Sequence, residues 1–197
     1  GIYIFDIELL CRELERDATD TSSRHDFGKD LLPRLINTHR VCGYRFGQSD
    51  SRTATRNHHC EDYWRDVGTI DAYHQASMDL LRDRPPLNLY SDRWPIRKYE
   101  TPAPPARVDR DLKGSPGVVT DSMLGNGVIV SGGAVNRSIL SPNVRVASEA
   151  VVTASILFDG VRVGAGAKLR KCIVDKGVQI PDGEMIGFDV TADAERF

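Results

Sequence analysis

Apolar residues recur at two different spacings along the chain, and the change in spacing divides it into two parts. In the first part, residues 1–5 are mostly apolar and predict a strand. The segment "DIELLCRELERDA" follows, with Ile7, Leu10 and Leu14 on one helical face and charged residues off it. The beginning of the chain therefore predicts a strand that leads into an amphipathic helix.

Further along this first part, helix-like and strand-like segments alternate. Asp26 can cap a second helix, which Pro33 would keep short or bent. Residues 40–46, "RVCGYRF", alternate like a strand, and a polar loop follows at 48–62. Residues 63–67, "YWRDV", are again strand-like.

A third helix is expected directly after this last strand. Thr69 can cap the segment "IDAYHQASMDLLRD". Four of its apolar residues fall near one face, namely Ile70, Tyr73, Leu80 and Leu81. Strands that alternate with helices predict an α/β layer.

A proline-rich stretch separates the two parts, because six of the ten prolines lie between residues 85 and 105. We expect an α/β domain portion at 1–93, a linker at 94–116, a β-helix at 117–190 and a tail at 191–197.

The second part repeats itself. The nonapeptide "SILSPNVRV" at 138–146 returns as "SILFDGVRV" at 155–163 and as "CIVDKGVQI" at 172–180, and "SMLGNGVIV" at 122–130 is an earlier version. Successive copies are offset by 16, 17 and 17 residues. Apolar residues recur about every six positions, at Val128, Ala134, Leu140, Val146, Val152, Leu157, Val163, Leu169, Val174, Ile180 and Ile186. Three hexads per turn are typical of a parallel β-helix with these residues inside, and β-hairpins would alternate at two instead.

Composition and charge exclude several classes of function. A net charge of −2 gives no basic surface for nucleic acid and no polybasic membrane patch, and no apolar run is long enough to span a bilayer. The four cysteines have no close pairing, which favours reduced thiols in a cytosolic protein. The first residues have no lead-in, as if the chain were cut from something longer.

The predicted β-helix contains no obvious catalytic group. Acyltransferases of this architecture need a general base, normally histidine, between turns. All the histidines precede it, at His25, His39, His58, His59 and His74. A structural or assembly role is therefore favoured for residues 117–190. The basic residues Lys168, Arg170 and Lys171 are either solvent-facing or contacts for an anionic effector.

Two other motifs are weak. "NHHC" at 57–60 has adjacent histidines that splay apart, so a solvated loop is favoured over a metal site. The glycines of "GVRVGAGAK" at 160–168 follow the hexad spacing, so they serve β-helix corners and not a phosphate loop.

One carboxylate stands out in the first part. Asp66 lies at the end of a strand-like segment, with a Gly-Thr pair and a helix directly behind it. An aspartate in this position often caps the local turn. A carboxylate at a strand end can equally bind a divalent cation, and from the residues alone both roles stay open.

Several segments together resemble one enzyme family. "GIYIFD", "SSRHDFGKDLLPRL", "YWRDVGTIDAY", "NLYSDRWPI", "SPNVRV" and "CIVDKGVQIPDGEMIG" are similar, in order and spacing, to the bacterial glucose-1-phosphate adenylyltransferases of glycogen synthesis. The resemblance implies a Rossmann-like nucleotidyltransferase domain, of which residues 1–93 would be the C-terminal part, and a left-handed β-helix. It also implies that the glycine-rich nucleotide loop and a further metal-binding aspartate lie outside this chain, which alone would be inert.

The same resemblance assigns roles to residues. ATP and glucose 1-phosphate would give ADP-glucose and diphosphate, with Asp66 as catalytic residue and Mg²⁺ ligand. Trp64 would shape the sugar pocket, and the backbone of Gly1 would approach the sugar. The family is expected to be cytoplasmic and homotetrameric.

Two other functions stay open. The chain could be a non-catalytic regulatory or assembly module in which the β-helix packs subunits together. A guanylyl- or uridylyltransferase for another sugar is disfavoured by the segments at 63–69 and 88–96, although the base-recognising residues would lie outside this chain.

Overall fold

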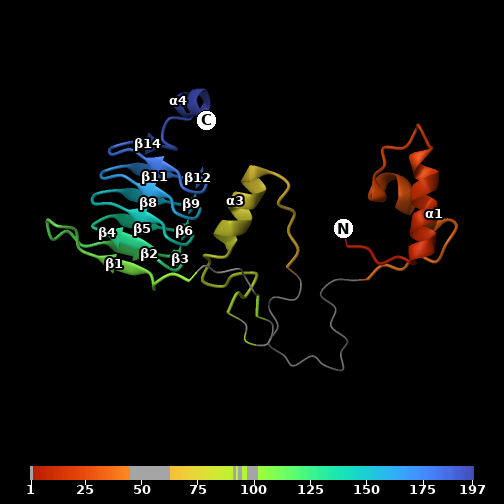
Figure 1. The fold of residues 1–197 in the computed structure, drawn as a ribbon, viewed down its shortest axis with the longest axis horizontal. Helices are drawn as coiled ribbons and strands as arrows, with labels where there is room; N and C mark the ends of the chain where they lie inside the picture. The colour runs from red at the N-terminus through yellow and green to blue at the C-terminus, as the bar shows by residue number, and fades with distance from the viewer. Residues whose placement is uncertain (1, 45–62, 91, 93–94, 97–101) are drawn as a thin grey trace. The chain divides into compact units, whose positions relative to one another are not determined.

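The computed structural model describes residues 2–44, 63–90, 92, 95–96 and 102–197 (Figure 1). The chain forms two compact units, Gly1–Phe46 and Gly47–Phe197. The predicted polar loop at 48–62 lies outside the described residues, as do the last two residues of the predicted strand at 40–46.

The first unit is built from helical segments. Helix α1 runs Ile7–Ala18 and begins at Asp6, whose carboxylate accepts a hydrogen bond from the Leu9 amide at 3.0 Å. Asp26 accepts hydrogen bonds from two amides and so caps η1, a π-helical turn at Phe27–Leu31. This turn continues directly into α2, Leu32–Ile36.

The short second helix confirms the effect expected of Pro33. Proline lies in the first turn of α2 and has no N–H to donate, so it interrupts the hydrogen bonding that runs on from η1. The wider π-turn before it absorbs the change in hydrogen bonding. Leu31 and Leu35 are each 1% exposed and form the apolar centre of this unit.

The predicted apolar face of α1 is wrong for this structure. Ile7 and Leu14 are exposed, and the buried residues of the helix are Glu13 and Asp17. These two carboxylates are buried because Arg34 of α2 pairs with both of them.

The predicted strands of the first part are absent from the described residues. Residues 2–5, 40–44 and 63–67 have neither helical nor strand structure. A strand needs a neighbour to take up its backbone hydrogen bonds, and these segments find none among the described residues. Near the start of the chain, Tyr3 instead stacks on Phe27 with ring centroids 5.6 Å apart.

The third predicted helix is present. Helix α3 runs Ile70–Asp79, and the Thr69 hydroxyl accepts a hydrogen bond from the Ala72 amide at 3.1 Å, as expected of its cap. Leu80 and Leu81 lie just beyond its end.

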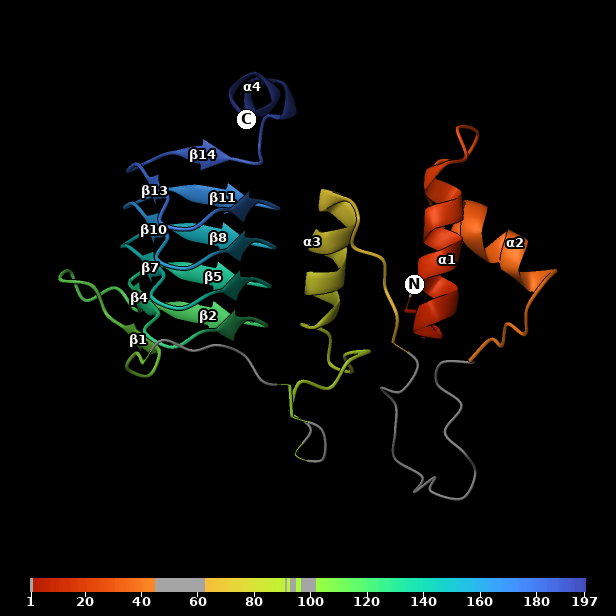
Figure 2. The same cartoon turned by 45° about the vertical axis from the view of Figure 1, so that its right-hand side comes forward.

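The rest of the second unit is a stack of short parallel strands (Figure 2). Their bounds are β1 Arg107–Asp109, β2 Val118–Thr120, β3 Met123–Leu124, β4 Ile129–Ser131, β5 Ala134–Asn136, β6 Ile139–Leu140, β7 Arg145–Val146, β8 Val151–Thr153, β9 Ile156–Leu157, β10 Arg162–Val163, β11 Lys168–Arg170, β12 Ile173–Val174, β13 Gln179–Ile180 and β14 Met185–Ile186. They form three sheets, in the orders β1-β4-β7-β10-β13, β14-β11-β8-β5-β2 and β12-β9-β6-β3. Each turn of the chain adds one strand to each sheet, which confirms the predicted β-helix of about four turns.

The predicted inward positions are confirmed with one exception. Leu140, Leu157 and Val174 are 1%, 0% and 7% exposed. The prediction is wrong at Ala134, which is half-buried. Val135 beside it is the inward residue and is 1% exposed. In the register of the sheet Val135 lies between Val119 and Val152, so the apolar column continues through it and not through Ala134.

A polar column also runs through the bore. Ser138 and Ser155 are 0% exposed, and each hydroxyl donates to the carbonyl two residues earlier, at 2.8 Å. Each oxygen also accepts the amide of the next turn: Ser155 N lies 3.1 Å from Ser138 Oγ, and Cys172 N lies 3.2 Å from Ser155 Oγ. These buried hydroxyls are therefore satisfied and join three successive turns.

One corner of every turn uses left-handed backbone without glycine. After β2, β5, β8 and β11 the corner residues are Asp121, Arg137, Ala154 and Lys171, with φ between 46° and 54°. Non-glycine residues pay a steric cost in this region. Cross-turn hydrogen bonds help to offset it, such as the one from Ala154 N to Asn136 O at 3.0 Å.

Turn length changes at a different corner. Val130 pairs with Val146, and Ala134 pairs with Val151, so the connection from β7 to β8 has one residue more than the connection from β4 to β5. The change from an offset of 16 to one of 17 is thus taken up outside the strands.

The two ends of the stack differ from the predicted boundaries. Strand β1 falls inside the stretch expected to be a linker and pairs with β4, so the sheet starts before residue 117. The expected tail contains helix α4, Val190–Arg196, capped by Asp189. Asp193 of this helix accepts the Gly187 amide at 2.8 Å, which ties α4 to the last turn.

We expect Leu157→Asp to unfold the second unit, because an unpaired charge would replace a fully buried side chain in an apolar bore. The loss of packing alone should lower the free energy of unfolding by about 3 kcal/mol or more. Urea denaturation followed by circular dichroism measures it. Arg162→Asp, on the exposed side of β10, is the control and should unfold near the wild-type midpoint.

Candidate functional site

Asp66 lies at the point where the irregular segment 63–68 enters α3. Its side chain is exposed, and Oδ1 accepts a hydrogen bond from the Gly68 amide at 3.2 Å. Gly68 sits close to the carboxylate, since a Cβ at that position would lie 3.4 Å from both oxygens. The carboxylate is thus oriented by the turn and stays open to solvent.

The other two predicted site residues are Trp64 and Gly1. Trp64 precedes Asp66 by two residues and is 60% exposed. Gly1 lies outside the described residues. Trp64 and Asp66 therefore share one short segment, on which both side chains are exposed.

Asp66 has the chemistry of a partial Mg²⁺ site. Its exposed carboxylate uses one oxygen for the Gly68 amide, and no described residue is found on the other oxygen. Magnesium is usually held by one or two carboxylates together with substrate phosphates. Among the described residues, no group of three or more His, Cys, Asp and Glu could hold a metal ion alone.

A buried carboxylate next to this segment was not singled out from the sequence. Asp79, at the end of α3, is 2% exposed. Its Oδ2 lies 2.6 Å from Arg65 Nη1, and its Oδ1 lies 2.6 Å from Arg82 Nη2 and 3.3 Å from Gln75 Nε2. The helical spacings to Gln75 and Arg82 are visible in sequence, but the pair with Arg65 requires the fold.

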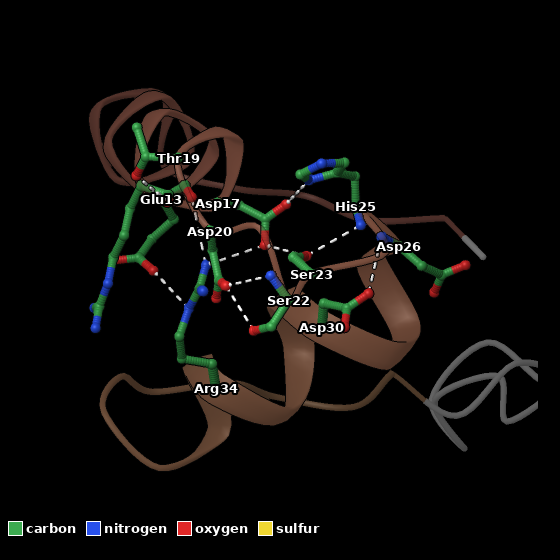
Figure 3. A network of polar contacts seen from close by, with 11 residues as sticks. Glu13, Asp17, Thr19, Asp20, Ser22, Ser23, His25, Asp26, Asp30 and Arg34 are labelled. Carbon is green, nitrogen blue, oxygen red and sulfur yellow. Dashed lines mark hydrogen bonds and ion pairs between the residues drawn. The ribbon is translucent and has the colours of Figure 1, made fainter.

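A polar network in the first unit joins α1 to α2 (Figure 3). Arg34 Nε lies 3.2 Å from Glu13 Oε2, an ion-pair distance without hydrogen-bond alignment, and Arg34 Nη2 lies 3.7 Å from Asp17 Oδ1. Asp17 also accepts from the Ser23 hydroxyl and from His25 Nδ1, both at 2.8 Å. A carboxylate can only accept, so His25 Nδ1 is the donor of this hydrogen bond.

These contacts change the acidity of Asp17. The hydrogen bond from His25, then that from Ser23, lowers the pKa of Asp17 below its ordinary value of 3.8, against the opposing effect of burial. The partners named here all lie within the first unit, so the evident role of the network is to hold the loop at 19–26 and both helices together.

The basic residues Lys168, Arg170 and Lys171 of the β-helix differ in their contacts. Arg170 Nε donates to Gly187 O at 3.0 Å, and its guanidinium lies 4.5 Å from the centre of the Phe188 ring. Lys168 and Lys171 are exposed. Arg170 therefore supports the last turn.

Each of the two parts of the chain matches a known protein family. Residues 1–83 match the family described as nucleotidyl transferase, and residues 104–197 match the family described as GlmU-like, C-terminal hexapeptide. The second match begins before β1, in agreement with the early start of the sheet.

Curated relatives match along the whole chain. Glucose-1-phosphate adenylyltransferase 2 of Vibrio parahaemolyticus is 51% identical over all 197 residues, which make up 48% of that protein. The Vibrio cholerae protein of the same name is 48% identical, with 47% of its length covered. Glucose-1-phosphate adenylyltransferase of Paramagnetospirillum magneticum is 44% identical, with 45% covered.

A nucleotidyltransferase portion followed by a left-handed hexapeptide β-helix defines the class of this chain. Within that class it is a homologue of the glucose-1-phosphate adenylyltransferases, as the resemblance predicted. The chain spans about half the length of the curated relatives that it matches. None of the described helices is both long and apolar enough to span a lipid bilayer.

We expect the stability of the first unit to fall in acid because of Asp17. Its pKa is lowered on folding, so the folded state binds fewer protons than the unfolded state near pH 3.8; the contribution is complete above that pH and is lost as the pH falls through the folded value. Asp17→Asn removes it at every pH. The difference in urea midpoint between wild type and this variant should therefore shrink on acidification.

The matched control for this measurement is Glu15→Gln, an exposed carboxylate on the same helix. It should follow the wild-type pH dependence. A difference between wild type and Asp17→Asn that stayed constant from neutral to acidic pH would contradict the assignment.

Proposed function

We propose that this chain is the part of a glucose-1-phosphate adenylyltransferase that carries one metal-binding aspartate and the β-helix. The full-length protein would convert ATP and glucose 1-phosphate to ADP-glucose and diphosphate. The observation that carries this proposal is identity of up to 53% along all 197 residues to proteins of that name. The cytosolic location expected from unpaired cysteines belongs to the same proposal.

Asp66 is the residue of this chain on which the chemistry rests. The reaction brings two anions together, and a bound Mg²⁺ would screen their repulsion and the charge that develops on diphosphate. Asp66 would contribute one carboxylate oxygen to that ion, and the rest of the nucleotidyltransferase domain would contribute the other ligands. The Gly68 amide orients the carboxylate at the start of α3.

Trp64 and Gly1 would contact the sugar. An exposed indole on the same segment as Asp66 can pack against a sugar ring, and this supports the role of Trp64. The role of Gly1 rests on the family resemblance alone.

In the full-length protein we expect Asp66→Asn to lower turnover about 100-fold or more, because one preorganised charge at the metal is removed while the side chain keeps its shape. Steady-state assays across a Mg²⁺ titration measure the loss. Asp71→Asn, in the first turn of α3, is the matched control and should act like wild type. Wild-type turnover and Mg²⁺ dependence in Asp66→Asn would return the residue to the role of a turn cap.

The β-helix would assemble the protein as a homotetramer. Three apolar residues stand exposed in one column of its sheet, Val118 at 48%, Val151 at 37% and Met185 at 49%. Ala134 and Lys168 complete this column in the register of the strands. An apolar stripe on a rigid sheet supports an interface with a second copy.

We expect the full-length protein to sediment as a tetramer at micromolar concentration. Val151→Glu should shift it to smaller species without unfolding it, because the change puts a charge in the exposed apolar column and leaves the bore intact. Sedimentation velocity distinguishes the species, and thermal denaturation checks the fold. A wild-type protein that sedimented only as a monomer would exclude this assembly.

A further inference from the structure

The buried carboxylate of Asp79 requires a reason. It is 2% exposed, and a carboxylate out of water is costly unless it is paired and hydrogen-bonded. Three donors from three positions meet it, on Arg65, Gln75 and Arg82. Gln75 and Arg82 lie on or next to α3 itself, so of the three contacts of Asp79 only the one with Arg65 reaches the segment before the helix.

Arg65 belongs to the segment that carries the proposed site. It lies between Trp64 and Asp66, in residues 63–68, which have no strand or helix structure of their own. The ion pair from Arg65 to Asp79 therefore fixes the chain at the residue between Trp64 and Asp66, whose side chains are both exposed.

Helix α3 is in turn attached to the β-helix (Figure 2). His74 Nε2 donates to the carbonyl of Ala154 at 2.7 Å, and the rings of Tyr73 and Phe158 are 6.4 Å apart. Ile156 faces out of the bore, since Ser155 and Leu157 on either side face in, yet it is only 2% exposed. The helix thus lies against the sheet that contains β9.

The attachment is specific to one turn. The corners equivalent to Ala154 carry Asp121, Arg137 and Lys171, all with the same left-handed backbone. A long or charged side chain at this corner would stand where the helix approaches. Ala154 is the small residue of this column, and its carbonyl receives His74.

We infer that Asp79 is a positioning residue: anchored by α3 to one turn of the β-helix, it holds Arg65 and thereby orients Asp66 and Trp64 toward the reaction site. The inference rests on the proposed function of Asp66. It adds that metal binding depends on contacts between the β-helix and α3. Supporting residues of this kind typically change metal affinity or activity by about 10- to 100-fold when they are lost.

The test compares variants of the full-length protein in a Mg²⁺ titration of activity. Asp79→Asn and Arg65→Gln should each raise the half-saturating Mg²⁺ concentration and lower kcat about 10-fold, and the double variant should be no worse than either one, because both remove the same contact. Arg65→Lys should recover much of the loss. Arg82→Gln removes another partner of the same carboxylate without touching segment 63–68 and should stay near wild type.

A second measurement does not need activity. In the full-length protein, hydrogen exchange of the amides of residues 63–68 should be faster in Arg65→Gln than in wild type, while that of α3 is unchanged. Arg65→Gln leaves Asp79 with two hydrogen-bond donors, on Gln75 and Arg82. This variant therefore tests the positioning role even if Asp79→Asn does not fold. Lys171 occupies the equivalent corner of the next turn. Ala154→Lys places that residue type where α3 is attached, and it should raise the half-saturating Mg²⁺ concentration in the same way.

The outcomes separate the two proposals. Wild-type Mg²⁺ dependence in Asp79→Asn and Arg65→Gln, with activity lost in Asp66→Asn, would overturn the positioning role and leave the proposed function standing. Wild-type behaviour of Asp66→Asn would overturn the proposed role of Asp66, on which the positioning role rests. Wild-type behaviour of Ala154→Lys alone would show that the β-helix does not take part.

Discussion

The structure depends on the fact that one turn of a β-helix cannot cover its own apolar side. Each strand is two or three residues long and has no stability alone. It becomes stable when the turns above and below take up its backbone hydrogen bonds and its inward side chain. Stacking therefore decides which residues are inside, where the corners fall and which face is left for other parts of the chain.

The inward serines show how strictly the stack is defined. A hydroxyl in an apolar bore is tolerated when both its proton and its lone pair are used, and Ser138 and Ser155 achieve this by bonding to their own turn and to the next. A shift of one turn by a single residue would leave these groups unpaired. The polar column thus opposes slippage in a stack whose apolar residues are nearly interchangeable.

The sequence predicts the second unit far better than the first. The β-helix is predictable because its repeat records the contacts of each residue with its counterparts one turn away, and only local detail fails, as at Ala134 and Val135. The capped helices after Asp26 and Thr69 are predictable because a cap is a local interaction. The strands expected at 2–5 and 63–67 fail because a strand requires partners that no local pattern reveals.

The candidate site divides in the same way. Asp66 could be found from a short motif and a family resemblance. Asp79 could not, because its burial and its pair with Arg65 exist only once segment 63–68 and α3 have folded together. The carboxylates of α1 are a similar case, since Glu13 and Asp17 look like surface residues until Arg34 is brought to them.

The extra residue between β7 and β8 bears on how such a chain can vary in length. The strands on either side keep their pairing although one turn is longer than the one before it. Insertions and deletions of a residue at this corner are therefore absorbed without moving any inward side chain, whereas the same event inside a strand would turn its inward residue outward. Homologues of different length can in this way share one bore, and alignment gaps within the family should gather at the corners.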